Sequence, residues 1–406
     1  TLAFVDEILS AASDYDEQLY RSDYDELPSD QPRMQQLWER HQALDLPDGV
    51  AWDDGAVPSR LRERLQARVD RLLAEQRPDY HPGTGECVRD VVHPSLFPFV
   101  KGRTKLAPGA QAPSEPAAGS RDRWGRPYER SKYQWLPTPF AVDRQGGVRV
   151  LSYINNLDRN VYPEVYDDLA ELFGVMLPLF ESVYGYAGSV AFHSEDVPEH
   201  ELPEGRPRRK ASKNPSPISL RDRELQVITK IVEYRVGPEP FESVWHVEGM
   251  SHENILATGV YVLDRDPALE GGDLQFKRAY TREEAGRLFW NIPQCRSEAM
   301  DDMIGRGAVP AGSLGTPAGR LLVFPNSHIH QLSAMRAGGG AKEATRRVIV
   351  LWLVDPERPI VSTREVRPQQ GTMSLADAEK FRLALMKERK FHKQSLNERA
   401  VSLCEH

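Results

Sequence analysis

The chain has 406 residues, a formal net charge of −8, 40% hydrophobic residues and 28% charged residues, which are the proportions of an ordinary globular protein with a sizeable core. The acidic balance argues against a protein that coats nucleic acid, and no run approaches the roughly 18 apolar residues of a membrane span. The opening residues have no basic segment typical of a signal peptide, and the three cysteines (Cys87, Cys295 and Cys404) are far apart. We therefore expect a cytoplasmic protein without disulfides that binds neither nucleic acid nor membranes.

The first 86 residues are predicted to form a helical region. Its clearest element is a helix that begins near residue 59, where apolar side chains recur every three or four positions. These side chains are Leu61, Leu65, Val69, Leu72 and Leu73. This spacing is typical of a helix that packs one face on a core.

Residues 87–224 are predicted to form an α/β extension packed on the core. A helix is expected from Glu164 to Tyr186, and Pro178 should kink or break it because proline lacks a backbone N–H. The Pro- and Gly-rich stretch 107–123 is predicted to be a mobile loop or an active-site flap. The basic run 206–213 has no interleaved aromatic residues, which favours a solvated loop over a nucleic-acid patch.

From residue 225 the hydrophobic pattern changes to a period of two, which indicates β-strands. Successive strands with few helices between them favour an antiparallel double-sheet roll over a β-α-β arrangement. The predicted fold class is therefore α+β, with a double-stranded β-helix (jelly roll, cupin-like) core at 225–360 and N-terminal and flanking helices. A C-terminal helical tail is expected at 361–406, its helix beginning near Ser374.

The segment WHVEG at 245–249 carries the candidate chemistry. Residues i and i+2 of an extended chain point to the same side, so His246 and Glu248 can aim an imidazole and a carboxylate at one point. Two histidines and one carboxylate form the facial triad of non-heme Fe(II) oxygenases, which leaves metal positions open. The third ligand is available in FPNSHIH at 324–330, as either His328 or His330, since strand parity does not separate these two.

Arg346 heads an apolar strand, RRVIVLW, that follows the candidate ligands. A guanidinium binds a carboxylate through two parallel hydrogen bonds and keeps its charge. Metal ligands followed by such an arginine is the order that a 2-oxoglutarate-dependent oxygenase needs. Arg347 would face the opposite side of the strand, where a surface salt bridge is the simpler interpretation.

Two neighbouring features have simpler explanations than a role in chemistry. GGDL at 271–274 is predicted to be a hairpin turn. His252 and Glu253 follow the HxE pair closely but fall in a predicted loop, where they would at most support the metal ligands indirectly. An isolated HxE pair is a weak signal, and it is the order of HxE, GGDL, FPN…H and Arg346 that strengthens it.

Five pieces of the chain together resemble a domain-of-unknown-function family common in fungi, which itself resembles the 2-oxoglutarate/Fe(II)-dependent oxygenases. The pieces are VRDVVHPSLFP (88–98), YQWLP (133–137), SYINNL (152–157), WHVEG (245–249) and LVDP (353–356). The last third is also similar to the prolyl-hydroxylase type.

The resemblance implies that His246, Glu248 and His330 form the catalytic metal centre and that Arg346 binds the cosubstrate. It favours His330 over His328 because the family's FPN segment carries its histidine six residues after the phenylalanine.

This chain departs from the family pattern at two positions. Glu248 stands where aspartate is more usual, which lengthens the ligand arm. Val348 stands where some relatives have a serine that meets the cosubstrate carboxylate. We therefore expect Tyr261 or Thr258, on the neighbouring strand, to supply that hydroxyl.

The expected function is oxidation of a small molecule, for which an amino-acid-like compound is one candidate, using Fe(II), 2-oxoglutarate and O2 and releasing succinate and CO2. Hydroxylation is the default outcome, and cyclisation or desaturation stay open. One alternative is a protein or peptide hydroxylase or demethylase of the same superfamily. Two others are a zinc-dependent hydrolase, which would leave Arg346 without a task, and a non-catalytic cupin-like binding module. The sequence leaves the oligomeric state undetermined.

Overall fold

The structure is a computed structural model that describes residues 2–21, 29–45, 47–111, 117, 119–194, 197–204 and 218–395. The basic run predicted at 206–213 lies outside the described residues, as do residues 112–116 and 118 of the predicted flap and the end of the C-terminal tail beyond residue 395.

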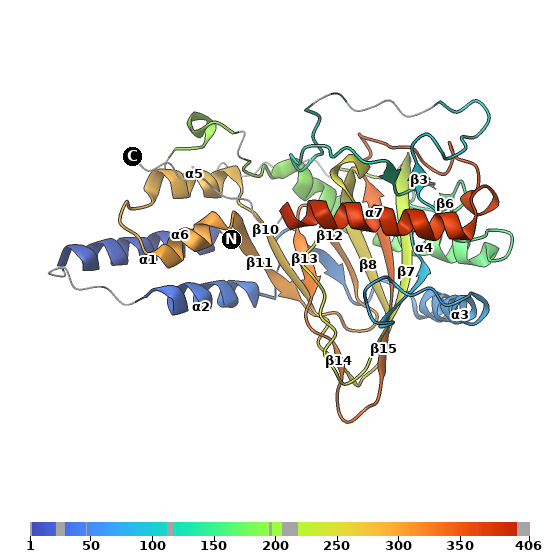
Figure 1. Cartoon of the computed structure of the whole chain (residues 1–406), viewed down its shortest axis with the longest axis horizontal. Helices are drawn as coiled ribbons and strands as arrows, with labels where there is room; N and C mark the ends of the chain where they lie inside the picture. The colour runs from blue at the N-terminus through green and yellow to red at the C-terminus, as the bar shows by residue number, and fades with distance from the viewer. Residues whose placement is uncertain are drawn as a thin grey trace.

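The architecture is mixed helix and sheet, as predicted, and its centre is one large antiparallel sheet (Figure 1). The strand order is β1-β12-β8-β15-β7-β5-β6, with β2 also paired to β7. These strands are β1 (Ala51–Asp53), β2 (Val88–Val92), β5 (Thr138–Val142), β6 (Val148–Val150), β7 (Arg223–Val236), β8 (Ile255–Arg265), β12 (Leu321–Pro325) and β15 (Ala344–Val354).

A smaller antiparallel sheet has the order β11-β10-β13. Its strands are β10 (Leu274–Ala279), β11 (Ala308–Leu314) and β13 (Ile329–Leu332). Two short pairs complete the strands: β3 (Phe99–Val100) with β4 (Tyr133–Gln134), and β9 (Leu269–Glu270) with β14 (Arg336–Ala337).

The alternation along the long strands separates two cores. Side chains on one face of the large sheet pack against the smaller sheet and form what we call the inner core, which includes Ile228, Val260 and Val350 from the large sheet and Phe276 and Leu314 from the smaller one. Because successive strand residues point to opposite faces, the residues between them form an outer core on the other side.

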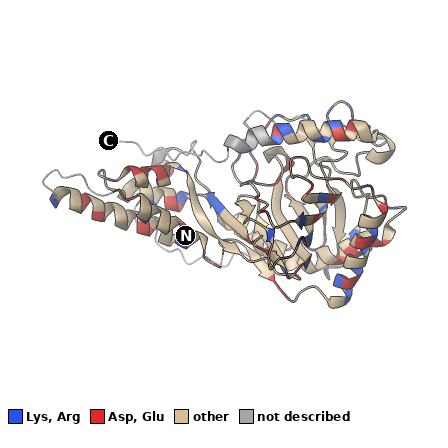
Figure 2. Ribbon diagram, turned by 60° about the horizontal axis from the view of Figure 1, so that its bottom comes forward, with Lys and Arg blue, Asp and Glu red and all other residues tan. Residues whose placement is uncertain are grey.

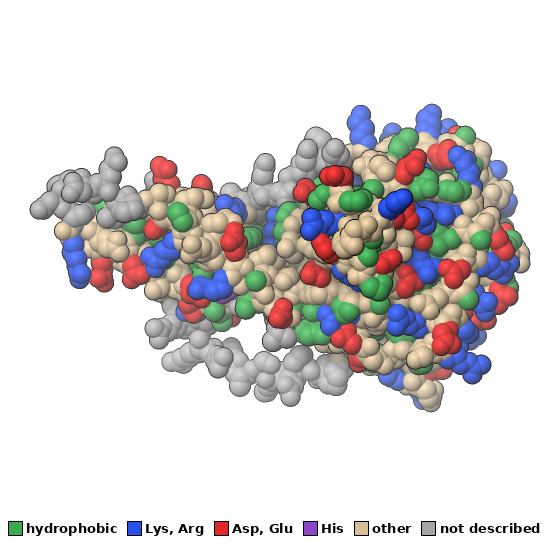
Figure 3. Space-filling view, turned by 90° about the horizontal axis from the view of Figure 1, so that it is seen from below, with side chains coloured by type: hydrophobic (Ala, Val, Ile, Leu, Met, Phe, Trp, Pro, Cys, Tyr) green, Lys and Arg blue, Asp and Glu red, His purple; other side chains and the backbone are tan. Residues whose placement is uncertain are grey.

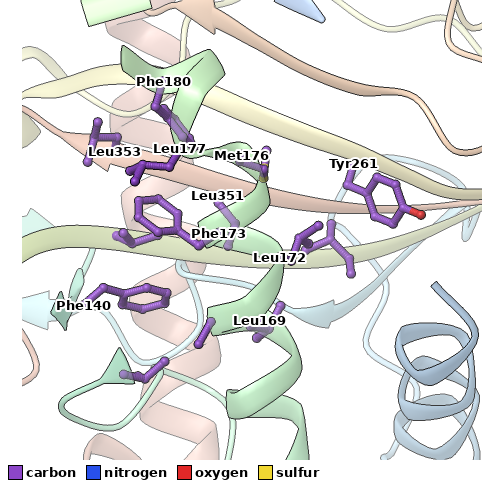
Figure 4. Packing of buried hydrophobic residues seen from close by; sticks show 14 of the residues in the cluster. Phe140, Leu169, Leu172, Phe173, Met176, Leu177, Phe180, Tyr261, Leu351 and Leu353 are labelled. Atoms are coloured by element: carbon purple, nitrogen blue, oxygen red, sulfur yellow. The ribbon is translucent and has the colours of Figure 1, made fainter. Parts of the chain in front are cut away.

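The outer core lies under helices α3 (Ser59–Glu75) and α4 (Pro163–Ser189) (Figure 4). The predicted stripe on α3 is confirmed, since its residues Leu61, Leu65, Val69 and Leu72 are buried. Helix α4 continues through Pro178, so this proline does not break it. The helix approaches the sheet closely at Gly259, where a Cβ atom would lie 2.4 Å from Met176 Cε.

Four helices form a separate arm at one side of the sheets (Figure 1). They are α1 (Leu2–Arg21), α2 (Gln31–Gln42), α5 (Arg282–Asn291) and α6 (Glu298–Gly305). The arm has its own apolar core, in which Phe4 and Leu37 meet Leu288 and Met300. The N-terminal helices therefore pack with a helical insertion between β10 and β11. The segment boundaries proposed from the sequence stay a prediction.

Helices α5 and α6 were missing from the sequence prediction, although a local signal for α5 exists. Thr281 caps this helix: its Oγ1 accepts a hydrogen bond from the Glu284 backbone N–H at 3.1 Å, and a Glu284 carboxylate oxygen accepts one from the Thr281 backbone N–H at 2.8 Å. This reciprocal pair is the capping box that T-x-x-E encodes.

The C-terminal helix predicted from Ser374 is confirmed as α7 (Leu375–Ser395), with Ser374 Oγ accepting a hydrogen bond from the Asp377 backbone N–H. It crosses the sheets (Figure 1), and Leu385 joins the inner core. Acidic and basic residues are interspersed over the ribbon (Figure 2) and over the face seen from below (Figure 3). Among the described helices, none has the length and apolarity needed to span a membrane.

Candidate metal centre

Three side chains from two segments converge at one edge of the smaller sheet. His246 pairs with His330 of β13 as an isolated antiparallel bridge, through backbone N–H to O hydrogen bonds of 3.0 and 2.9 Å. One Glu248 carboxylate oxygen lies 3.9 Å from His246 Nε2 and 3.7 Å from His330 Nε2. The structure therefore brings together the three predicted ligands, whose donor atoms all lie within 4.8 Å of one another.

The two histidine rings are oriented with Nε2 inward. His246 Nδ1 lies 2.7 Å from the Val244 carbonyl oxygen, and His330 Nδ1 lies 3.3 Å from the His328 carbonyl oxygen. A carbonyl accepts only, so the ring proton belongs on Nδ1 in each case, and Nε2 presents its lone pair toward Glu248. Metal-binding histidines commonly have this arrangement, in which the second nitrogen donates to a carbonyl.

A second group with metal-ligand chemistry, His81, Asp90 and His93, differs from the first in its tautomer. The Ser95 backbone N–H donates to His93 Nδ1 at 3.0 Å, which places the ring proton of neutral His93 on Nε2, the nitrogen that faces Asp90. Burial holds the pKa of His93 well below its ordinary value, so the ring is neutral. A protonated Nε2 cannot bind a metal, and the first cluster is the better candidate.

His328 does not join the centre. It lies in a bend before β13, so the parity argument that left it equivalent to His330 does not apply. Its Nε2 faces the Asp48 carbonyl oxygen at 2.6 Å, and burial lowers its pKa to about 4. His328 is a neutral structural residue, and His330 is the histidine that reaches Glu248.

Asn326 holds the carboxylate ligand in place, a role that the sequence did not predict. Its Oδ1 accepts a hydrogen bond from the Glu248 backbone N–H at 3.0 Å, and its Nδ2 donates to the Glu248 carbonyl at 2.9 Å. The side chain is fully buried. The asparagine of FPN therefore fixes the backbone of one ligand from the segment that also carries His330.

Replacing Asn326 with Ala is expected to weaken metal binding roughly tenfold to a hundredfold, because two hydrogen bonds are lost and two backbone groups lose their partner. Calorimetric titration with Zn²⁺ measures the change. Asn155→Ala is the matched control: Asn155 is also buried and donates two hydrogen bonds, to the Leu96 and Phe97 carbonyls. Equal Zn²⁺ affinity in wild type and Asn326→Ala would contradict this role.

Arg346 is buried on the inner-core side without an acidic partner. It pairs across the sheet with Tyr234, over whose ring its Cζ lies at 5.9 Å. Nη1 donates to the Gly272 carbonyl at 3.0 Å, while Nε is buried without a hydrogen-bond partner. Among the described residues no carboxylate forms an ion pair with it, and burial lowers its pKa to about 10. At neutral pH Arg346 is therefore a positive charge in the protein interior, which a bound anion would stabilise.

Arg347 faces the opposite side and forms ion pairs with Asp70 and Asp264. The prediction of a surface salt bridge for this residue is confirmed. Of the two adjacent arginines, Arg347 forms ion pairs with acidic residues, whereas Arg346 forms none with a described carboxylate.

Gly272 supports Arg346 directly, so the GGDL segment has more than the turn role predicted for it. The Gly272 carbonyl accepts hydrogen bonds from both Arg346 Nη1 and Thr316 Oγ1. Its φ of +80° suits glycine, and a Cβ atom there would lie 2.9 Å from Met335 Sδ and 3.2 Å from Arg346 Nη1.

The two hydroxyls expected to assist Arg346 are elsewhere. Tyr261 belongs to the outer core, on the opposite face of the sheet, as Figure 4 shows. Thr258 faces inward but pairs with Trp352, six positions along β15 from Arg346, which corresponds to about 20 Å. Both expectations are therefore wrong, because the sequence alone does not show which residues pair across neighbouring strands. The tyrosine beside Arg346 is Tyr234.

His252 and Glu253 do not reach the centre as ligands. His252 Nε2 lies 3.0 Å from the Tyr133 carbonyl oxygen. The Glu253 carboxylate is fully buried and accepts backbone hydrogen bonds from Trp135 and Met250. Glu248 is thus the carboxylate that belongs to the His246 and His330 cluster.

A family model described as "Protein of unknown function (DUF4246)" matches residues 24–376. No curated protein matches the chain. Among solved structures, an oxidoreductase of the 2OG-Fe(II) oxygenase family from Burkholderia pseudomallei is 13% identical with a TM-score of 0.32, the match covering 78% of this chain and 88% of that chain.

Two further solved structures are similar to this chain. A prolyl hydroxylase from Trichoplax adhaerens, in complex with a hypoxia inducible factor peptide fragment, is 11% identical with a TM-score of 0.33 and covers 77% of this chain and 86% of its own. IDO from Bacillus thuringiensis is 15% identical with a TM-score of 0.20. The match covers 32% of this chain and 46% of that chain, so this chain spans less than half the length of IDO. At identities and TM-scores this low, function has to be inferred from the residues of this chain.

Proposed function

The chain belongs to the DUF4246 family, whose function is unknown, and we propose that it is an Fe(II)- and 2-oxoglutarate-dependent oxygenase. The observation that carries the proposal is the convergence of three metal-ligating side chains in a core that also contains the buried cation Arg346. The donor atoms of His246, Glu248 and His330 all lie within 4.8 Å of one another, and among the described residues no carboxylate forms an ion pair with Arg346. A dicarboxylate bound to a metal at the first site would offer its second carboxylate to Arg346.

The strand order supports a double-stranded β-helix for the core. From β7 to β15 the chain crosses repeatedly between the two sheets: β7, β8, β12 and β15 belong to the large sheet, and the His246 segment, β10, β11 and β13 to the smaller side, where β10 and β11 follow each other directly. This crossing between two facing sheets is the pattern of a jelly roll. The candidate ligands come from the smaller side and Arg346 from the large sheet, and these two sheets face each other across the inner core.

The donor set fits Fe(II). Two imidazoles and one carboxylate on one side of a metal leave the remaining coordination positions open, as in non-heme iron oxygenases. Glu248, His246 and His330 would hold the ion, with Asn326 fixing the Glu248 backbone. The His246 side chain is 26% exposed and the His330 side chain 5%, so the centre is most accessible on the His246 side.

Arg346 would bind the distal carboxylate of 2-oxoglutarate through its two remaining donor groups, with Gly272 keeping the guanidinium in position. Tyr234, whose ring lies under the Arg346 guanidinium, would offer its hydroxyl to the same carboxylate. Bound Fe(II) and 2-oxoglutarate would supply the oxidation of a C–H bond by O2, with release of succinate and CO2.

We propose a small molecule as the substrate and hydroxylation as the outcome, with cyclisation or desaturation as variants of the same chemistry. The partly exposed His246 side chain supports a substrate that enters from this side. A zinc hydrolase would use the same three ligands but would leave Arg346 a buried cation without purpose.

The test is an anaerobic titration of the protein with Fe(II) and then 2-oxoglutarate, followed by visible absorption. We expect the weak metal-to-cosubstrate charge-transfer band to appear at one equivalent of each. Tight Zn²⁺ binding without any such band in the iron form would contradict the oxygenase and favour the hydrolase or the binding module.

A further inference from the structure

Glu253, five residues after the candidate ligand Glu248, is a buried carboxylate with several hydrogen bonds. It is fully buried, and its two oxygens accept hydrogen bonds from the Trp135 backbone N–H at 2.5 Å and the Met250 backbone N–H at 2.8 Å. Nη2 of Arg389 donates to both oxygens, at 2.6 and 2.8 Å. A buried carboxylate needs such a cation, because burying its charge alone is costly.

Glu253 also lies close to the backbone that follows Glu248. Gly249 has a φ of +63°, and a Cβ atom there would lie 2.7 Å from Glu253 Oε2, while the Met250 backbone N–H donates to that same oxygen. The backbone is therefore held at Glu248 by Asn326 and, two residues later, at Met250 by the Glu253 carboxylate. Moving that carboxylate would release the second of these two supports.

The cation that holds Glu253 comes from α7. Arg389 stacks on the Trp135 ring with Cζ 3.9 Å from the ring centroid, and Trp135 packs on Trp352 of the inner core with centroids 5.0 Å apart. Arg389 is 6% exposed, and Leu385, one turn earlier, is also buried. Docking of α7 thus delivers the guanidinium to Glu253 from a segment 136 residues away in the chain.

We propose that Arg389 is a positioning residue for the metal centre, and that the docked helix α7 fixes Glu248 through Glu253. The inference rests on the metal centre of the proposed function, but not on its oxygenase chemistry. Because coupling between two sites is reciprocal, metal binding and the docking of α7 should stabilise each other.

The experiment compares two arginines of the full chain. Arg382 lies seven positions before Arg389 and is similarly buried, but it pairs with Asp79 rather than with Glu253. Arg389→Met is expected to weaken Zn²⁺ binding about tenfold, whereas Arg382→Met should leave the Zn²⁺ dissociation constant within twofold of wild type. Both variants are expected to lower the melting temperature, so stability alone does not separate them.

Hydrogen exchange on the wild-type protein gives a first readout that needs no substitution, since Zn²⁺ should slow amide exchange in α7. In a second arm, Glu253→Gln, which keeps the shape but removes the charge, should reduce that protection. The proposal would be overturned if Arg389→Met kept wild-type Zn²⁺ affinity, or if Zn²⁺ had no effect on amide exchange in α7. A wild-type protein that binds no metal would instead overturn the proposed function itself.

Discussion

Replacing Arg346 with Met is expected to weaken 2-oxoglutarate binding by a factor on the order of 100 or more while Fe(II) binding is retained. Two charge-assisted hydrogen bonds to a buried carboxylate are lost, each contributing about 1.5–3 kcal/mol, and about 1.4 kcal/mol corresponds to tenfold in affinity. Anaerobic titration measures both constants on the same sample.

Arg347→Met is the matched control for this result. It removes the same charge from the adjacent position, but on the face that pairs with Asp70 and Asp264. The control should keep wild-type affinity for 2-oxoglutarate. An Arg346→Met protein with unchanged 2-oxoglutarate affinity would show that the buried cation serves another anion.

Arg346→Met should not lower the stability of the ligand-free protein. Arg346 is buried with its Nε lacking a hydrogen-bond partner, so a methionine of similar volume relieves a desolvated charge. Thermal melts without ligand should therefore show an equal or higher midpoint for Arg346→Met, and added 2-oxoglutarate should raise the midpoint only in the wild type. This pattern would mark a site retained for binding at the expense of stability.

Replacing Glu248 with Ala is expected to reduce metal affinity by at least about a hundredfold, because the only carboxylate of the cluster is removed. Calorimetric titration with Zn²⁺ and with Fe(II) measures the loss, and the charge-transfer band should disappear with it. His330→Ala should behave similarly.

The second histidine cluster provides the control for Glu248→Ala. His81→Ala removes one member of the group whose tautomer argues against metal binding. We expect one metal per chain in both wild type and His81→Ala. If His81→Ala loses the metal and Glu248→Ala retains it, the assignment of the centre is wrong.

The strand period predicted much of the candidate centre. The i, i+2 spacing predicted that His246 and Glu248 share a side, and the structure brings both to His330, although Glu248 lies in a bend rather than in a strand. Arg346 is buried on β15. The same reasoning separated Arg346 from Arg347 correctly, because adjacent strand residues always face opposite sides. Local geometry of this kind depends only on residues close together in the chain.

The errors came from relations between distant segments. Periodicity shows that Tyr261 and Thr258 face opposite sides, but it does not show which side is inner or how far each lies from Arg346 along the sheet. The support that Asn326 gives the Glu248 backbone depends on a contact across 78 residues of sequence, and the link from Arg389 to Glu253 spans 136 residues. The sequence offered Glu253 only as an indirect support, and no local pattern pointed to Asn326 or Arg389.

The arm built from the N-terminal helices and the helical insertion between β10 and β11 has a consequence for synthesis. Helix α1 ends at Arg21, but its partner α5 begins at Arg282, 261 residues later in the chain. At a translation rate of about 5–20 residues per second, the apolar face of α1 waits between roughly ten seconds and a minute for its partner to leave the ribosome. During that interval Phe4 can meet Trp38 and His41 of α2, but the contacts that α1 makes with α5 are still missing. We therefore expect this apolar face to bind chaperones on the nascent chain before the sheets have formed.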